Sequence, residues 1–431
     1  MKLFKTMMTG MLSMAALAVL ADDVTVSGYT VTIPVENPVA GGARVVRLQV
    51  INDNIIRVQA TSADQLPDKP KSLMIVPQKP RTAVDVSEDD DVVTVKTKGV
   101  TAKVDEKTGR IEFFDPDGKL LLKEAEQGKT FKPFRVPDRE IGVDVAKVPE
   151  SQRNGLTWRM LFDSPREEAF YGLGQHQSEE LNMKGLNEDL FQYNTKVSVP
   201  FVLSNRNYGL LWDSYSYCRF GNPDEYLQLG RAFKLYDKQG REGHLTGTYT
   251  DKQGKRIQRD EDSIYYEFDC PAASELGNRT EPGGIKNLPQ GFDLNGATVV
   301  YEGYIEAPVE ALYHFILYYA GYIKVYIGGQ EVVAERWRTA WNPNTYKFRK
   351  PLPKGKRQQL RIEWRPDGGV SYCGLRVARQ NKDQRKLSIW SEMAQDMDYY
   401  FIAGRDADEV ISGYRTLTGK APVYPKWALG F

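Results

Sequence analysis

Residues 191–216 read FQYNTKVSVPFVLSNRNYGLLWDSYS, and this stretch decides the fold. Its first half predicts a β-strand that ends at the turn residues Asn205–Asn207. Gly209–Trp212 then form a short apolar run, which is typical of a strand buried on both faces. The two strands together indicate an antiparallel hairpin in the core of a β-sandwich.

A glycine-rich turn lies just before this hairpin, in the stretch AFYGLGQHQSEELNMKG at residues 169–185. Tyr171–Gly174 predict a tight passage from a strand into a loop. The turn does not fit a phosphate-binding loop, because no Gly-Lys-Ser/Thr triplet and no helix start follow it.

Strands of the same kind continue toward the N-terminus. Residues 44–61 alternate apolar and polar side chains around the turn residues Asn52–Asn54. Residues 92–122 repeat the pattern, with turns at Glu106–Gly109 and Asp115–Gly118. Strands at this spacing, joined by turn residues and without long helical stretches, predict a mainly β, antiparallel sandwich.

A second β-rich region begins near Gly240 and is interrupted by a Gly- and Pro-rich loop at residues 274–291. The segments on either side of this region, residues 220–237 and 387–404, both have the pattern of strands of one sandwich. The middle region is therefore predicted to be a domain inserted at a loop tip, where its two ends lie close together. Residues 406–417 follow with the signals of a helix.

The first 21 residues predict a signal peptide. Lys2 and Lys5 precede a short apolar run, and small residues stand before Asp22. The run is too short to span a membrane, although an uncleaved membrane anchor is the alternative reading. We therefore expect an exported protein, periplasmic or secreted, with no membrane span after removal of residues 1–21.

The charge balance argues against several partners. The chain has 58 basic and 57 acidic residues and a net charge of +1. No broad positive field is available to attract nucleic acid or anionic lipid, so neither is expected as a partner.

No metal or cofactor is predicted. The acidic cluster Glu88–Asp91 lacks the spaced oxygen ligands of a calcium loop and favours a solvated turn. The histidines lie too far apart in sequence to form a zinc-binding pair. One cysteine pair could form a disulfide, but buried thiols are favoured. These residues are His176, His244 and His314, and Cys218, Cys270 and Cys373.

Taken together, the segments resemble glycoside hydrolase family 31, the α-glucosidases and α-xylosidases. The matching positions are Tyr171–Gln175, Gln192, Asn194, Pro200, Phe201, Ser204, Tyr208, Gly209 and Leu211–Asp213. In that family they belong to a galactose-mutarotase-like N-terminal sandwich. The resemblance covers residues 24–237 and 386–431, and it implies a sandwich at residues 22–237 that resumes at 381–420.

The inserted region, residues 238–380, resembles a protective-antigen-type β-sandwich. The stretches HLTGTYTD, FILYYAGYIKVYIGG and LRIEWRPDGG carry this resemblance. Modules of this type that bind calcium and sugar have paired aspartates where this chain has Tyr318 and Tyr319. The resemblance therefore implies a second sandwich without a calcium site.

The final residues, PKWALGF, resemble the first strand of the family's (β/α)₈ barrel. We expect residues 421–431 to be that strand, the rest of the barrel to be absent from this chain, and the chain alone to be inactive. The family's chemistry implies retaining cleavage of α-glycosidic bonds by two carboxylates on later barrel strands. No catalytic residue is therefore assigned here.

The resemblance also points to substrate-binding residues. A loop at residues 178–196 is expected over the barrel mouth, with Asp189, Gln192 and Asn194 as candidate partners for sugar hydroxyls and Asn187 and Glu188 beside them. Carboxylates and amides accept hydrogen bonds from such hydroxyls. The alternative is that these residues cap turns in a solvated loop.

A second candidate lies in the stretch ERWRTAWNPNTYKFRK at residues 335–350. Trp337, Trp341 and Tyr346 are candidates for stacking on sugar rings. The alternative is that they belong to the core of the inserted sandwich.

The expected function is that of the N-terminal portion of an exported retaining α-glycosidase with oligosaccharide substrates. The resemblance favours an α-xylosidase that acts on xyloglucan oligosaccharides. An α-glucosidase of the same family is the second choice. If the chain is complete as given, the expected function is that of a non-catalytic carbohydrate-binding protein.

Overall fold

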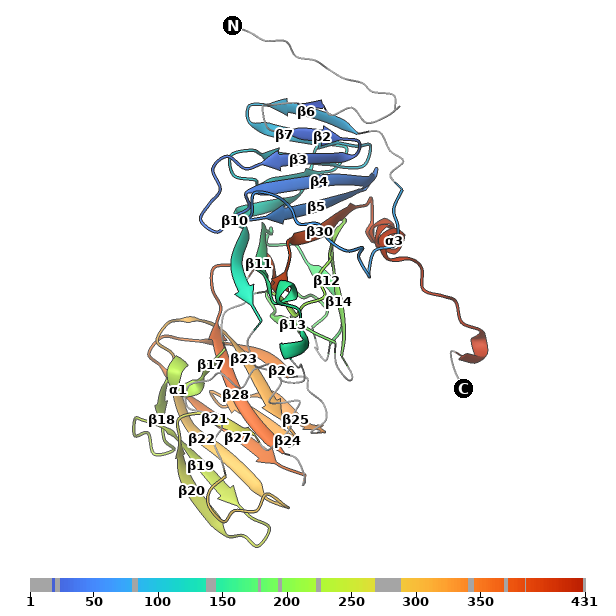
Figure 1. Cartoon of the computed structure of the whole chain (residues 1–431). Helices are drawn as coiled ribbons and strands as arrows, with labels where there is room; N and C mark the ends of the chain where they lie inside the picture. The colour runs from blue at the N-terminus through green and yellow to red at the C-terminus, as the bar shows by residue number, and fades with distance from the viewer. Residues whose placement is uncertain are drawn as a thin grey trace.

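The computed structural model describes residues 18–19, 24–79, 84–136, 145–176, 180–192, 196–221, 226–267, 288–339, 345–367, 371–383 and 385–428. Figure 1 shows two β-sandwiches placed end to end, with helix α3 against the side of the first. Every pair of named strands is antiparallel within this part of the chain. The predicted mainly β, antiparallel fold is confirmed.

The first sandwich consists of two sheets. Sheet 1 has the order β1 (Ala18–Val19), β2 (Thr25–Ser27), β3 (Thr30–Pro34), β4 (Val45–Asn52), β5 (Ile55–Thr61), β30 (Met397–Ala403), β15 (Tyr208–Trp212), β14 (Val197–Ser204) and β12 (Phe170–Gln175). Sheet 2 has the order β13 (Glu188–Leu190), β16 (Cys218–Phe220), β29 (Leu387–Ala394), β11 (Asn154–Asp163), β10 (Leu120–Arg135), β9 (Ile111–Phe114), β8 (Thr101–Asp105), β7 (Val92–Lys96) and β6 (Asp85–Asp89). Two 3₁₀ turns, Val145–Lys147 and Glu150–Gln152, precede β11.

The second sandwich runs from Leu227 to Arg379. Sheet 3 has the order β17 (Leu227–Gln228), β28 (Tyr372–Arg379), β23 (Ala311–Tyr319) and β26 (Tyr346–Leu352), with β21 (Ile264–Glu267) also on β28. Sheet 4 has the order β20 (Arg256–Glu261), β19 (Leu245–Thr250), β22 (Thr298–Glu306), β27 (Arg357–Arg365), β24 (Gly321–Ile327) and β25 (Gln330–Arg338), with β18 (Lys234–Tyr236) also on β22. A single helical turn, α1 (Leu229–Ala232), follows β17.

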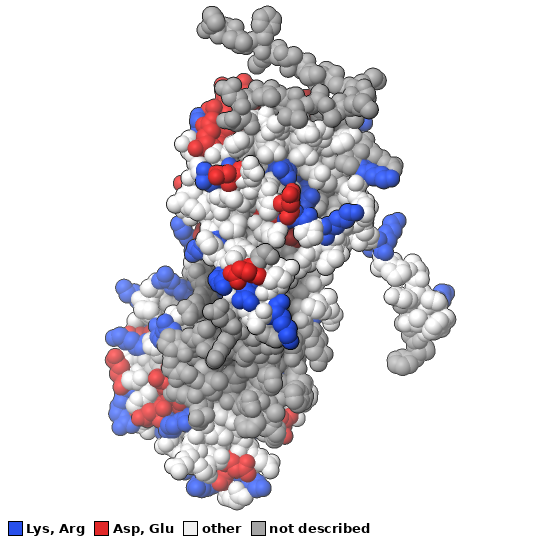
Figure 2. All heavy atoms as spheres, viewed as in Figure 1, with Lys and Arg blue, Asp and Glu red and all other residues white. Residues whose placement is uncertain are grey.

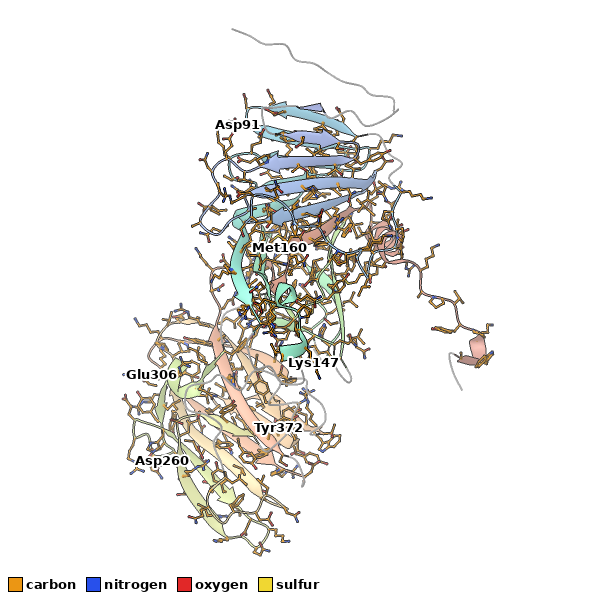
Figure 3. All side chains as sticks on the ribbon, viewed as in Figure 1. Asp91, Lys147, Met160, Asp260, Glu306 and Tyr372 are labelled. Carbon is orange, nitrogen blue, oxygen red and sulfur yellow. The ribbon has the colours of Figure 1, made fainter. Side chains whose placement is uncertain are left out.

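Alternating side chains build each core. In β22 the odd-numbered residues from Val299 to Ile305 face inward, and every second residue is more exposed. Figure 3 places Met160 inside the first sandwich, where it is fully buried, and Tyr372 in the second. The two sandwiches have separate clusters of buried apolar side chains.

The central strand β30 is buried on both faces, which explains the apolar run Tyr399–Ala403 in its sequence. Tyr399 and Phe401 belong to the core between the sheets, whereas Tyr400 and Ile402 pack under α3 (Ala407–Thr418). Burial of each such large side chain contributes roughly 1.5–3 kcal/mol. The helix approaches so closely that a Cβ on Gly413 would lie 2.5 Å from Cγ2 of Ile402.

The second sandwich is inserted between two neighbouring strands of the first. β16 enters the insertion and β29 returns from it, and the two strands pair, with Cys218 opposite Ser391 and Phe220 opposite Ile389. The two ends of the inserted region therefore lie side by side in sheet 2, as a domain insertion requires.

Two of the expected turns are hairpin turns. Asn207, between β14 and β15, has a positive φ of 65°. Asp90 and Asp91, between β6 and β7, have φ values of 49° and 62°, the conformation of a two-residue type I′ turn. The Asp91 carboxylate pairs with Lys107, so part of the acidic cluster has a protein partner.

The C-terminal segment differs from the expectation of a strand. Lys426–Ala428 form one 3₁₀ turn away from both sandwiches (Figure 1), and the side chains of Tyr424 and Trp427 are exposed. A strand is stabilised by pairing with a neighbouring strand, and Val423–Ala428 have no such neighbour among the described residues. The prediction of a strand was wrong for the described part of residues 421–431.

Candidate functional site

A β-bulge in β12 positions the first part of the site. Gly172, Leu173 and Gly174 all have positive φ, and the register with β14 shifts between the two glycines. A Cβ on Gly174 would lie 2.2 Å from the carbonyl oxygen of Val197, so only glycine fits there. The bulge bends β12 so that His176 Nε2 lies 2.7 Å from the carbonyl oxygen of Leu173.

Other motif residues have a structural role. The buried Glu168 carboxylate accepts hydrogen bonds from Ser204 Oγ at 2.6 Å and from Tyr208 Oη at 2.7 Å. Both donors belong to the β14–β15 hairpin. This network ties the hairpin to the segment before β12, and it explains the polar residues in an otherwise apolar motif.

The central feature of the site is a cluster of charged groups around β13, which we call the β13 cluster. It consists of His176, Glu188, Asp189, Lys196, Tyr217, Arg219 and Lys347. Asp189 Oδ1 accepts a hydrogen bond of 2.5 Å from Tyr217 Oη. Arg219 Nε donates to the same phenol oxygen at 2.7 Å and lies 3.5 Å from Asp189 Oδ1.

Asp189 is held in its charged form. Burial opposes ionisation, but the positive charges of Lys347 and Arg219, with Lys196 and the Tyr217 hydroxyl, outweigh it and lower the pKa of Asp189 to about 2. Its side chain remains 33% exposed. At neutral pH this side chain is therefore an ionised acceptor that is open to solvent.

Lys196 has the opposite shift. Burial, with the nearby charge of Lys347, lowers the pKa of its ammonium group to about 8. The ammonium lies 4.2 Å from the centroid of the Phe191 ring, a cation–π contact. Burial also lowers the pKa of His176, although Glu188 lies 3.8 Å away and opposes the shift.

Gln192 uses its side-chain amide to hold the loop. Nε2 donates to the carbonyl oxygen of Lys196 at 3.0 Å, and Oε1 accepts from the backbone N–H of Ser198 at 3.1 Å. Asn187 donates to Tyr226 Oη at 2.7 Å. Asn194 lies outside the described residues.

The two aromatic candidates within the described residues lie on strands of different sheets. Trp337 is 53% exposed in β25, with its indole N–H held by Asp367 at 2.5 Å. Tyr346 lies in β26 of the other sheet, where the Arg336 guanidinium covers its ring at 3.9 Å. Trp341 lies outside the described residues.

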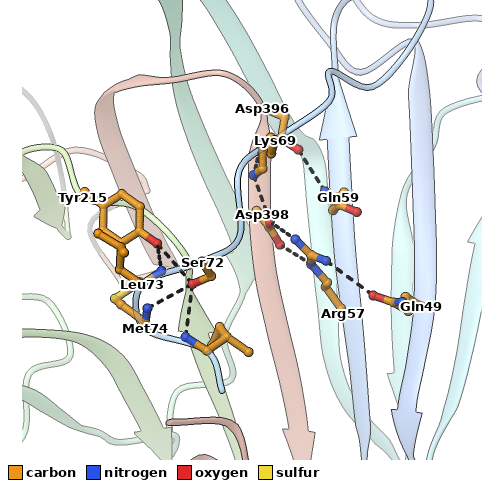
Figure 4. Close-up of polar contacts among 11 residues, drawn as sticks. Gln49, Arg57, Gln59, Lys69, Ser72, Leu73, Met74, Tyr215, Asp396 and Asp398 are labelled. Carbon is orange, nitrogen blue, oxygen red and sulfur yellow. Dashed lines mark hydrogen bonds and ion pairs between the residues drawn. The ribbon is translucent and has the colours of Figure 1, made fainter. Parts of the chain in front are cut away.

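A second polar cluster is structural. Asp398 accepts from Arg57 at 2.6 and 2.9 Å and from Lys69 at 2.9 Å, while Asp396 accepts from Lys69 and from Gln59 (Figure 4). Burial raises the pKa of Asp396 to about 6 against the effect of Lys69. Both carboxylates are fully shielded from solvent, so neither can contact a ligand at the surface.

The described residues contain no group of three or more His, Cys, Asp or Glu side chains arranged to hold a metal ion. Cys218 and Cys373 are free, buried thiols, while Cys270 falls outside this part of the chain. No helix there is long and apolar enough to span a membrane. Figure 2 shows Lys, Arg, Asp and Glu interspersed on the viewed face.

Sequence reasoning found Asp189 and Gln192 but missed their surroundings. Lys196, Tyr217 and Arg219 come from different elements, and Lys347 comes from the second sandwich. One available signal was the alternation Lys347-Phe348-Arg349, which places two cations on the face of β26 opposite the partly buried Phe348.

Comparison with known proteins supports the resemblance to glycoside hydrolase family 31. Residues 45–220 match the glycosyl hydrolase 31 N-terminal galactose mutarotase-like domain. A family 31 glucosidase of Pseudescherichia vulneris is 29% identical over 185 residues, 40% of this chain and 33% of the relative. An α-xylosidase of Saccharolobus solfataricus is 41% identical over 63 residues, 15% of this chain and 9% of the relative.

The solved structure of a family 31 α-xylosidase from Xanthomonas citri is similar over both sandwiches. It is 36% identical, with a TM-score of 0.77 over 93% of this chain and 41% of that protein. This chain thus spans less than half the length of these relatives. None of its described residues forms a (β/α)₈ barrel.

Proposed function

We propose that this chain is the N-terminal portion of an exported retaining α-xylosidase of glycoside hydrolase family 31, the family to which its first sandwich and its relatives are similar. The substrates would be xyloglucan oligosaccharides. The observation that carries this proposal is the similarity to the X. citri α-xylosidase over 93% of the chain, because it extends through the second sandwich.

In this proposal the loop around β13 contacts the substrate. Asp189 is the direct partner, since its Oδ1 is occupied by Tyr217 and its Oδ2, 3.9 Å from Lys347, remains the acceptor for a sugar hydroxyl. Gln192 keeps the loop in shape, as its amide bonds indicate. Asn194, Trp337, Trp341 and Tyr346 complete the proposed substrate-binding set.

The bond-breaking groups would lie on a barrel outside these residues. Retaining glycosidases use a carboxylate nucleophile and a carboxylic acid about 5 Å apart. Such sites lie at the C-terminal face of a barrel. The first sandwich would contribute substrate positioning, and the second sandwich, proposed to be of the protective-antigen type, would adjoin it.

The test is an assay of the protein expressed from its complete reading frame. We expect release of p-nitrophenol from p-nitrophenyl α-xyloside and release of xylose from xyloglucan oligosaccharides. Asp189→Ala should raise KM about tenfold with a smaller effect on kcat, because a binding contact is lost. The exposed Asp117→Ala on the far β9–β10 turn is the control.

Two outcomes would redirect the proposal. Preference for the α-glucoside over the α-xyloside would favour an α-glucosidase, consistent with the similarity to the P. vulneris glucosidase. Binding of oligosaccharide without hydrolysis would favour a carbohydrate-binding protein.

The proposed export has its own test. N-terminal sequencing of the protein recovered from the periplasm or medium should begin near Asp22 if residues 1–21 are a cleaved signal. A protein that retains Met1 in the cytosolic fraction would contradict it.

A further inference from the structure

Two cations of the second sandwich reach the β13 loop of the first. Lys347 in β26 donates to the carbonyl oxygen of Asn187 at 2.5 Å and to Glu188 Oε2 at 3.1 Å. Its Nζ also lies 3.9 Å from Asp189 Oδ2. One ammonium group from the second sandwich therefore contacts three consecutive residues of the first.

The same face of β26 holds the beginning of this loop. Arg349, two residues after Lys347, pairs with Glu180 at 2.8 Å. Residues two apart in a strand point to the same side, so Lys347 and Arg349 place two positive charges on one face of β26. Tyr226, just before β17, adds a third contact through Asn187. The loop segment Glu180–Gln192 is thus attached to the second sandwich at its beginning, through Glu180, and at Asn187–Asp189.

These contacts are shielded from solvent at the centre. The Glu188 side chain is 8% exposed and the Lys347 side chain 19%. On β23, His314 and Ile316 are each only 4% exposed, although they lie on the face opposite the core residues Phe315 and Leu317. This face of sheet 3 is therefore covered, and Lys347 lies in an interface rather than on an open surface.

Lys347 also balances charge that the first sandwich leaves uncompensated. Among the described residues, Glu188 has no other cation within ion-pair distance except His176, at 3.8 Å, and burial favours the neutral form of His176. When a shielded carboxylate loses its strong ion-pair partner, its buried negative charge destabilises the folded conformation around it. The segment that carries the carboxylate then shifts or becomes exposed to solvent.

We infer that Lys347 is a positioning residue through which the second sandwich fixes the conformation of the loop Glu180–Gln192. The functional part of this inference rests on the proposed function, which places Asp189 of that loop beside the substrate. The second sandwich would then act on the proposed site by holding a loop of its neighbour.

Hydrogen–deuterium exchange on the full chain tests the inference without any assay of activity. In Lys347→Met, amides of residues 180–192 should exchange about tenfold faster or more, while core strands of both sandwiches keep their protection. Lys350→Met is the matched control, because Lys350 lies in the same strand and pairs with Gln330 of its own sandwich. It should leave the loop unchanged within about twofold.

Two further variants guard against misfolding. Lys347→Arg should keep most of the protection, because the charge remains, and Glu188→Gln should reproduce the faster loop exchange from the other side of the contact. Unchanged loop exchange in Lys347→Met would overturn the inference. Equal loss of protection throughout both cores would also overturn it, since Lys347 would then act only on overall stability.

Kinetics on the complete enzyme adds the functional readout. Lys347→Met should raise KM about tenfold and leave kcat within about twofold, with Lys350→Met unchanged. If no glycosidase activity exists, the proposed function fails while the exchange result still decides the positioning role. Normal kinetics in an enzyme whose loop exchanges faster would overturn the functional part alone.

Discussion

Two buried charged clusters, one in each sandwich, are assembled in different ways. In the first, Asp398 accepts from Arg57, 341 residues earlier in the chain, and Asp396 accepts from Lys69, 327 residues earlier. In the second, the buried Glu261 accepts from Arg259 and Tyr249, at most 12 residues away. The cluster in the first sandwich joins distant parts of the chain, whereas the cluster in the second lies within the β19–β20 hairpin.

This difference has a consequence for folding. Closure of a long loop costs entropy that grows with its length. If the second sandwich folds first, its two ends are brought together. The loop that must be closed when β16 pairs with β29 is then effectively shorter. We therefore expect the second sandwich to fold independently and the folding of the first sandwich to depend on it.

The largest effect should come from the long-range pairs. Asp398→Asn leaves Arg57 without its fully buried anionic partner and Lys69 with Asp396 alone, and it should destabilise the first sandwich by about 3–5 kcal/mol. Calorimetry should show a lower first-sandwich transition and an unchanged second one, with the exposed Asp408→Asn as control. Equal shifts of both transitions would mean that the two sandwiches unfold as one.

The corresponding change in the second sandwich should have a smaller effect. Glu261→Gln removes a charge whose partner Arg259 is already 30% exposed, so we expect a loss of about 2 kcal/mol. Urea unfolding, monitored by hydrogen–deuterium exchange of the amides in β19 and β20, measures this loss of stability. Glu363→Gln, which breaks a pair that is 38% exposed on each side, should change stability by less than about 0.5 kcal/mol. A loss as large as that in Asp398→Asn would contradict the proposed contrast.

Asp189 lies where the two sandwiches meet, and its effect should depend on pH. Its pKa of about 2 lies below the ordinary 3.8, so its ionised form stabilises the fold above about pH 4, and this stabilisation is lost as pH falls through 2. Asp189→Asn should cost about 1–2 kcal/mol at pH 7, given a side chain that is one-third exposed, and close to nothing near pH 2. Urea unfolding at several pH values measures the difference, and a constant difference would exclude this electrostatic origin.

The smallest effect should come from helix α3, which packs only on the first sandwich. Asp406 caps the helix by accepting from the backbone N–H of Glu409 at 2.9 Å. Asp406→Ala should lower the stability of the first sandwich by about 1 kcal/mol, whereas Asp406→Asn retains a cap. A shift of the second transition in the calorimeter would show that the helix influences both sandwiches.

The sequence could predict those features that depend on neighbouring residues. The alternation at residues 44–61, the turn at Asn205–Asn207 and the apolar run of β15 are local patterns, and the structure confirms the strands they indicated. The assignment of residues 387–404 to the first sandwich is confirmed, because β29 and β30 lie in its two sheets. The assignment of residues 220–237 to the same sandwich was wrong beyond Phe220, because β17 and β18 pair with strands of the second sandwich.

The missed features depend on distance in space. Nothing near Lys347 in the sequence indicates that it meets Glu188, 159 residues earlier, because the contact requires the relative placement of two folded sandwiches. The same holds for Arg57 and Asp398. The segment Lys426–Ala428 was misassigned because apolar composition describes a buried strand only where another strand is present to pair with it.

The pairing of β16 with β29 has a consequence for the history and engineering of this chain. Phe220 and Ile389 are the last paired residues on the two sides of the insertion. They are opposite one another, about 5 Å apart, as in any antiparallel pair. A single deletion of residues 222–386, repaired with a two-residue turn, would leave an ordinary β-hairpin and the register of sheet 2 intact. The point of insertion is therefore a place where an entire domain can be exchanged while the strand order of the host sheet is kept, although the host loop held by Lys347 and Arg349 would need new partners.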